Sequence, residues 1–278
     1  MVFFEILKAI FLGIVEGITE WLPISSTGHM ILVDEFLKLN VSEEFKEMFF
    51  VVVQLGAIAA VPVMFWDKLY PFSRKKSREE RKKTMNLWGK VIVGVLPAAI
   101  IGLLLDDFFD EHFYNFTVVS IALIVYGVAF ILIEKFKKNK EYRIDDVHCL
   151  TYKDALVIGA FQMLSLIPGT SRSGSTILGG MLTGVSRVAS AEFSFFMAIP
   201  VMLGASLLKL VKFIIAGVAV SSIEIAILFV GIAVSFLVSL VAIKFLMDFV
   251  KKHSFIPFGI YRIILGGIVL GYYLTTIL

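Results

Sequence analysis

The chain reads EGITEWLPISSTGH at residues 16–29, a polar, proline-containing segment inside an otherwise apolar stretch. A second such segment, PGTSRSGST at residues 168–176, interrupts another apolar stretch in the second half of the chain. Helical backbone that is broken at membrane depth persists only where protein or a wet cavity surrounds it. The two segments therefore predict two re-entrant helical hairpins, over about residues 3–40 and 153–185.

The composition predicts that the remainder of the chain crosses a lipid bilayer. Of its 278 residues, 58% are hydrophobic and 18% are charged, whereas soluble domains contain about 45–50% apolar and about 25% charged residues. Six apolar runs are long enough to span a bilayer as helices. These runs cover residues 46–66, 87–105, 114–134, 192–215, 222–247 and 256–277. We expect an all-α, multi-pass integral membrane protein.

Each half of the chain has the same order of elements, one broken hairpin followed by three spans. Three crossings per half reverse the direction in which the second half enters the membrane, as in the inverted repeats of several transporters. The pattern predicts one membrane domain built from two repeats, residues 1–140 and 141–278. The tips of the two hairpins are expected to meet near the midplane.

The charges of the loops predict the orientation. Lysine and arginine concentrate in residues 67–90 and 135–153, and loops of this kind stay on the cytoplasmic side. Residues 106–112 are expected to form an outer loop that carries Asp106, Asp107, Asp110 and Glu111. The formal net charge of +3 is scattered along the chain and gives no reason to expect a nucleic-acid partner.

Glu16 and Glu20 are the clearest functional candidates in the first polar segment. Their spacing places both carboxylates on one helix face, with Cβ atoms about 5–6 Å apart. Two carboxylates in apolar surroundings share a proton or bind a cation. The alternative is an interfacial helix whose glutamates face water.

Hydroxyl side chains and a histidine follow the acidic pair. Ser25, Ser26 and Thr27 precede a predicted helix, where serine is often only an N-cap. His29 is a candidate base, nucleophile or cation ligand, with a purely structural role as the alternative.

The second polar segment has the composition of an anion site. Backbone N–H groups at a helix start and the guanidinium of Arg172 both suit phosphate oxygens. An arginine inside a membrane needs an anionic partner, and the candidates are Glu16, Glu20 or a bound phosphate. A structural ion pair between the two segments is the alternative. Together, the two segments contain the groups that phosphoryl transfer uses, and an embedded site implies a substrate with a lipid tail.

With these two segments, the sequence resembles the undecaprenyl-diphosphatase family, the bacitracin-resistance phosphatases of bacterial membranes. The resemblance covers essentially the full length and includes EFSF at residues 192–195 and SFIPF at residues 254–258. It implies hydrolysis of undecaprenyl diphosphate to undecaprenyl phosphate and phosphate, which recycles the lipid carrier for cell-wall synthesis and gives resistance to bacitracin. It also implies a multi-pass protein of the bacterial plasma membrane, with a site open to the outer face.

The resemblance also assigns roles to residues of the two segments. The implied catalytic residues are Glu16, Glu20, Ser26, His29 and Arg172. Those expected to bind the substrate are Ser25, Thr27, Ser171, Ser173 and Thr176. A divalent cation, Mg²⁺ or Ca²⁺, is expected on Glu16 and Glu20, because hard oxygen ligands suit a hard cation. Whether Ser26, His29 or water attacks the phosphate stays open, as does the oligomeric state, for which a homodimer is one alternative.

Two other functions are weighed against this interpretation. The type-2 phosphatidic-acid phosphatases also use a Ser-Gly-His element, but the chain has no Arg-Pro dipeptide. Neither Ser171-Arg172 nor Ser186-Arg187 is followed by histidine at the distance that this superfamily requires. A transporter or flippase of an anionic lipid or solute could use the same inverted-repeat site. Phosphate release by purified protein in detergent distinguishes an enzyme from a transporter.

Overall fold

The computed structural model describes residues 2–113, 115–137 and 141–277. Within these ranges the regular elements are helices, and the β-type contact is one isolated bridge between Ile144 and Val185. The all-α prediction is therefore confirmed. Five residues used in the charge argument lie outside what the structure describes, two of them entirely and three by their side chains. They are Lys138 and Lys140, and Asp106, Asp107 and Asp110.

Six helical segments of the described chain are long and apolar enough to cross a membrane. They are Glu43–Met64, Arg78–Leu105, Phe116–Lys137, Arg187–Ile215, Ser222–Lys252 and Ile256–Thr275. Each overlaps one predicted span, so the prediction of six spans is confirmed by length and composition. The first segment consists of α3 (Glu43–Val52) and α4 (Gln54–Met64), with Val53 between them in a helical conformation.

Several helices extend beyond the apolar runs. The expected outer loop at 106–112 is instead part of α6 (Arg78–Phe113), which continues past a kink at Leu105. The prediction of a loop at 67–90 is likewise too long, because α6 begins at Arg78. In the same way, α10 (Arg187–Ile215) begins before the apolar run that starts at residue 192. Charged residues end a hydropathy signal, but lysine, arginine and glutamate are good helix formers. Hydropathy therefore marks where the apolar run ends and misses where the helix ends.

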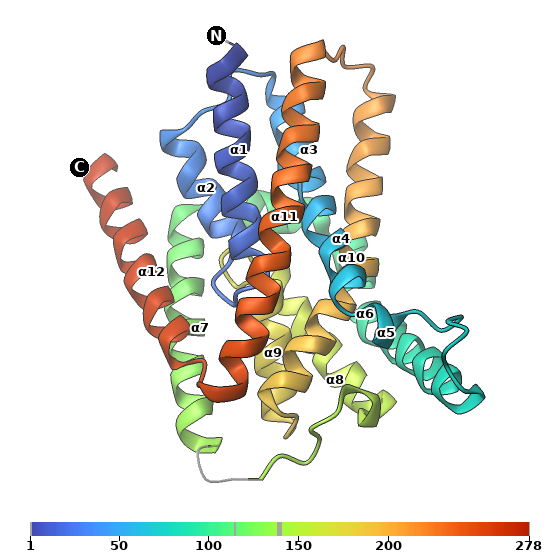
Figure 1. Cartoon of the computed structure of the whole chain (residues 1–278). Helices are drawn as coiled ribbons and strands as arrows, with labels where there is room; N and C mark the ends of the chain where they lie inside the picture. Colours follow the sequence, from blue (N-terminus) through green and yellow to red (C-terminus); the bar gives the residue numbers. More distant parts are fainter. Residues whose placement is uncertain (1, 114, 138–140, 278) are drawn as a thin grey trace.

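Each polar segment separates two helices that pack against each other. Residues 20–25 join α1 (Val2–Thr19) to α2 (Ser26–Phe36), whereas α8 (Tyr152–Met163) leads through η2 (Leu164–Leu166) and residues 167–171 to α9 (Arg172–Leu182). In Figure 1, α1 and α2 lie in the half that holds the N-terminus, and α8 and α9 lie in the other half. Both α2 and α9 have 11 residues, too few to cross a hydrocarbon core of about 30 Å at about 1.5 Å per residue.

Glycines allow the helices to pack closely. A Cβ atom added at Gly159 on α8 would lie 2.0 Å from the carbonyl oxygen of Gly94 on α6. Gly127 on α7 (Phe116–Lys137) and Gly259 on α12 (Ile256–Ile277) face each other in the same way, at 2.6 and 2.7 Å. Helix pairs in membranes use such small residues because van der Waals packing takes the place of the hydrophobic effect.

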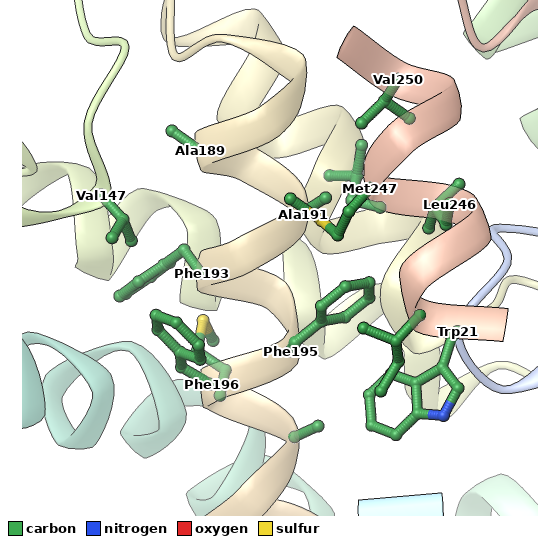
Figure 2. Close-up of a cluster of buried hydrophobic side chains, with 14 of the residues drawn as sticks. Trp21, Val147, Ala189, Ala191, Phe193, Phe195, Phe196, Leu246, Met247 and Val250 are labelled. Atoms are coloured by element: carbon green, nitrogen blue, oxygen red, sulfur yellow. The ribbon is translucent and has the colours of Figure 1, made fainter. Parts of the chain in front are cut away.

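A buried aromatic core supports the first break from one side. Figure 2 shows Trp21 beside α10 and α11 (Ser222–Lys252), close to Phe195. The two rings meet edge to face with their centroids 5.0 Å apart, and Phe193, Phe195 and Phe196 are fully buried. Two short helices, α5 (Trp66–Leu69) and η1 (Val147–Cys149), lie in connections between the long helices. Because Trp21 follows Glu20 directly, this core fixes the backbone at the acidic end of the break.

The Gly94–Gly159 contact provides a test of the packing. We expect Gly159→Ala to destabilise the folded protein by about 1–3 kcal/mol, because the added methyl group overpacks the crossing of α6 and α8. The thermal unfolding midpoint of the purified protein in detergent measures this effect. Gly204→Ala is the control, because a Cβ there meets nothing within 4 Å, and it should leave the midpoint unchanged or raise it. Equal midpoints for the two variants would contradict the proposed close packing.

Candidate active site

The two breaks share one local geometry. Ser25 and Ser171 immediately precede α2 and α9 and have φ angles of 74° and 73°. They are the non-glycine residues with positive φ in the described part of the chain. The Oγ atom of Ser25 accepts from the N–H of Gly28 at 3.2 Å, and that of Ser171 accepts from the N–H of Gly174 at 3.1 Å. Ser25 is therefore an N-cap, and its contact with substrate stays a prediction. The strained φ costs about 1–3 kcal/mol at each serine.

A buried ion pair joins the two segments. The Nη2 atom of Arg172 donates to Oε1 of Glu20 at 2.7 Å, and the hydroxyl of Ser26 donates to Oε2 of the same carboxylate at 2.6 Å. The two charged side chains are only 11% and 7% exposed. Arg172 also donates through Nη1 to the carbonyl oxygen of Ser194 at 2.8 Å. Glu20, one of the expected candidates, is thus the anionic partner that an embedded arginine needs.

Two buried polar atoms at this ion pair, one on Glu16 and one on Arg172 itself, have no hydrogen-bond partner among the described residues. Glu16 is 1% exposed, and its Oε1 atom has no hydrogen-bond partner in the described ranges. The Nε atom of Arg172 is buried and is also without a partner there. Leaving a buried polar atom unsatisfied costs about 1–3 kcal/mol. Glu16 lies one helical turn before Glu20, so a further proton or cation at this place would satisfy its free oxygen.

The two segments meet around one cavity of about 180 Å³. The predicted site residues that line it are Glu20, Ser25, Ser26, Thr27, Ser171 and Arg172. Apolar residues of α10, including Val201 and Met202, form another part of the wall. Sites that enclose a drug-sized ligand have volumes of about 300–1,000 Å³, so this cavity is smaller than such a site. The cavity therefore suits a compact headgroup whose tail stays outside it.

Two further polar residues line the cavity and were not predicted. Gln54 comes from α4, and Ser165 comes from the turn that follows α8. Gln54 is a polar amide in the middle of the first apolar run, which is an available signal in the sequence. Ser165 carried no such signal, because a single serine in an apolar helix usually bonds its own backbone. Its Oγ atom does donate to the carbonyl oxygen of Gln162 at 2.6 Å.

His29 is held on the side of α2 that faces α12. Its Nδ1 atom lies 2.7 Å from the carbonyl oxygen of Ser25, and its Nε2 atom lies 2.6 Å from the hydroxyl of Tyr261. Because a carbonyl only accepts, Nδ1 carries the hydrogen and Nε2 is left to accept from the tyrosine. His29 does not line the cavity in this structure. Its basic nitrogen is available to a substrate only if the bond to Tyr261 is exchanged.

Ser173 and Thr176 hold protein groups. Both are buried, and Ser173 donates through Oγ to the carbonyl oxygens of Glu20 and Leu22 at 3.2 and 3.3 Å. The hydroxyl of Thr176 donates to that of Ser194 at 2.7 Å. Neither residue lines the cavity. Their contact with substrate stays a prediction, and the contacts that the structure contains fix the shape of the second segment.

The sequence analysis missed Arg262, which is completely buried on α12. Its guanidinium donates to the carbonyl oxygen of Pro23 at 3.1 Å and to those of Gly169 and Thr170 at 2.8 and 2.9 Å. It therefore contacts both breaks. The signal was available, because an arginine inside an apolar span calls for a functional explanation. Arg262 lies in an uninterrupted apolar run, however, whereas Arg172 lies in one of the two polar segments.

The fold defines a multi-pass, all-helical membrane protein whose two polar segments meet around one cavity. The family model described as "Bacitracin resistance protein BacA" matches residues 9–268. The chain belongs to this family.

Relatives named undecaprenyl-diphosphatase are similar over nearly their whole length. That from Enterococcus faecalis (strain ATCC 700802 / V583) is 60% identical over 274 residues, 99% of each chain. That from Acetivibrio thermocellus is 60% identical over 98% of each chain, and that from Limosilactobacillus fermentum is 59% identical over 97% of this chain and 98% of its own.

A double-mutant cycle tests the Glu20–Arg172 pair. We expect Glu20→Gln or Arg172→Gln alone to cost about 3–5 kcal/mol of stability, because each leaves the other charge buried and unpaired. The double variant should lose less than the sum, with a coupling free energy of about 0.5–3 kcal/mol from chemical or thermal unfolding in detergent.

The Lys209–Glu47 pair is the control for this cycle. Its side chains are 34% and 64% exposed, so the coupling free energy should be only about 0–1 kcal/mol. If the losses of stability from the Glu20 and Arg172 substitutions simply added in the double variant, this result would contradict an energetic coupling between the two side chains.

Proposed function

We infer that the protein hydrolyses undecaprenyl diphosphate to undecaprenyl phosphate and inorganic phosphate. This reaction recycles the lipid carrier for cell-wall synthesis and gives resistance to bacitracin. The family membership and the relatives described above support this function. The observation in the site that carries it is the convergence of Glu20, Ser26 and Arg172 on one small cavity. The alternative of a transporter or flippase is not favoured.

Arg172 and the start of α9 would stabilise the charge of the transferred phosphoryl group. The first N–H groups of a helix have no acceptor within it, and they attract anions together with the helix dipole. The guanidinium adds planar donors suited to phosphate oxygens. Donors that are already oriented in a site from which water is excluded stabilise a developing charge without reorganisation.

Among the candidate nucleophiles, Ser26 has the most direct support. Its hydroxyl lines the cavity and already donates to the Glu20 carboxylate. In this mechanism Ser26 Oγ bonds to the terminal phosphorus, the bond from phosphorus to the bridging oxygen breaks, and Glu20 takes the serine proton. Undecaprenyl phosphate leaves, and water then cleaves the phosphoserine to release phosphate. Direct attack by water that His29 activates is the alternative, and it requires His29 Nε2 to release Tyr261.

A divalent cation, Mg²⁺ or Ca²⁺, is part of the proposal. The Oε1 atom of Glu16 has no hydrogen-bond partner among the described residues and lies one helical turn before Glu20. A carboxylate oxygen is the type of ligand that these cations prefer. No group of three or more acidic, histidine or cysteine side chains in the described residues could hold a metal. The remaining ligands would be diphosphate oxygens and water, and Mg²⁺ is commonly bound through one or two carboxylates and substrate phosphates. Such a cation would neutralise charge on the diphosphate.

We also propose the membrane arrangement that the sequence predicts, with two re-entrant hairpins in inverted repeats, residues 1–140 and 141–278. The matched serine caps and the 11-residue helices that follow both breaks support it. The lysine- and arginine-rich connection before α6 lies in the half of Figure 1 opposite the N-terminus, as does the C-terminal end of α7, whose last turn contains Lys135 and Lys137. By the positive-inside rule this half is cytoplasmic, and the site opens to the outer face. A homodimer stays a hypothesis, and the cavity itself is formed by one chain.

Substitutions at three predicted catalytic residues test the function. We expect Glu20→Gln, His29→Ala and Arg172→Ala each to lower phosphate release from an isoprenyl diphosphate by about 100-fold or more, the scale found for lost transition-state donors. The assay uses purified protein in detergent, because no membrane then separates two compartments and the assay cannot measure transport. Lys209→Gln, at an exposed ion pair, is the control and should retain parent activity. Near-normal turnover of a variant would refute the role of that residue.

Removal of divalent cations tests the metal hypothesis. A chelator should abolish phosphate release, and Mg²⁺ or Ca²⁺ should restore it. Glu16→Gln should raise the cation concentration for half-maximal activity by about 10-fold or more, the scale for altered metal environments. Glu47→Gln, an exposed glutamate on α3, should leave that concentration unchanged. Full activity in the presence of the chelator would contradict the cation.

A further inference from the structure

Arg262 connects both breaks to the last pair of helices. Besides Pro23, Gly169 and Thr170, it donates through Nε to the carbonyl oxygen of Leu123 on α7 at 3.4 Å. Its guanidinium also lies 5.4 Å from the ring centroid of Tyr126 on that helix. One side chain thus ties the first break, the second break and α7 to α12.

The acceptors of Arg262 differ from those of Arg172. All four are backbone carbonyl oxygens, whereas Arg172 has a carboxylate partner. Burying a cation is costly, so its retention calls for something that an apolar side chain could not provide. What Arg262 provides is the orientation of peptide groups in two irregular segments.

The orientation of one peptide group matters for the cavity. The carbonyl of Thr170 points at Arg262, and a planar trans peptide directs the following N–H the opposite way. That N–H belongs to Ser171, which is one of the residues that line the cavity. It donates to no acceptor within the part of the chain that the structure describes. The N–H of Thr170, one peptide earlier, is already bonded to the carbonyl of Ile167.

We propose that Arg262 is a positioning residue, which directs the N–H of Ser171 into the cavity as a donor to a phosphoryl oxygen and holds the first break against the second. It acts through the two breaks and does not itself touch substrate. This inference rests on the proposed phosphatase function. It adds a residue outside the two polar segments to those that the proposed reaction requires.

The test compares Arg262→Lys and Arg262→Gln with Glu134→Gln. Glu134 is a matched control, because it is also buried and also joins separate elements. It accepts from Arg187 and from the backbone N–H of Phe255 and does not line the cavity. The measurements are the thermal midpoint, kcat and KM for phosphate release in detergent, and the inhibition constant of inorganic phosphate.

The Arg262 variants should lose up to about 100-fold in kcat, the scale for a reacting group misplaced by about 1 Å, with a smaller change in KM. Inhibition by inorganic phosphate should weaken, because phosphate uses the same N–H. Glu134→Gln should lower the thermal midpoint while kcat and the phosphate inhibition constant stay at parent values. Arg262 variants that match Glu134→Gln in all these quantities would overturn the proposal.

Two other outcomes are decisive. If neither Arg262 variant folds, Tyr126→Leu removes the ring beside the guanidinium and leaves its charge in place. Lower kcat with weaker phosphate inhibition then supports the proposal, and parent values overturn it. If the parent protein itself releases no phosphate from an isoprenyl diphosphate, the proposed function fails first. An active parent with unaffected variants refutes only the role of Arg262.

Discussion

The structure depends on one constraint: irregular backbone inside an apolar bundle must find hydrogen-bond partners in the protein. Both breaks expose peptide groups that no helix satisfies. Ser25 and Ser171 cap the helices that follow, Ser173 donates to carbonyls of the first break, and Arg262 donates to carbonyls of both. The polar residues around the cavity therefore satisfy the backbone of the two breaks, and several of them are also the residues proposed to act on the substrate.

This double use explains why the two segments converge. Each break contains charged or polar groups that have no partner within the same segment. Groups of the other break supply these ion-pair and hydrogen-bond partners. Glu20 neutralises Arg172 across the boundary, and Ser173 on α9 reaches back to the residues around Trp21. The close glycine crossings, such as Gly94 against Gly159, then hold the flanking helices so that these contacts persist.

Hydropathy and the two breaks predicted the all-α class and the six long segments, because burial in lipid demands long apolar runs. They failed at helix ends such as 106–112, where charge was interpreted as loop. Glu20 and Arg172 were singled out by their charge inside apolar stretches and Ser26 by the family resemblance, and the structure places all three at one cavity. Arg262 and Gln54 could not be assigned, because their role depends on which helix faces the breaks. The direction of His29 toward Tyr261 is a tertiary fact with no local signal.

The Glu20–Arg172 pair has a consequence for selectivity. Arg172 is paired with the Glu20 carboxylate, and if Arg172 binds the substrate phosphate as proposed, that carboxylate would compete with the phosphate for the guanidinium. A headgroup must carry enough negative charge to displace it. A diphosphate meets that demand better than a monophosphate, and the glutamate is therefore suited to reclaim the arginine after the reaction and help to expel the product.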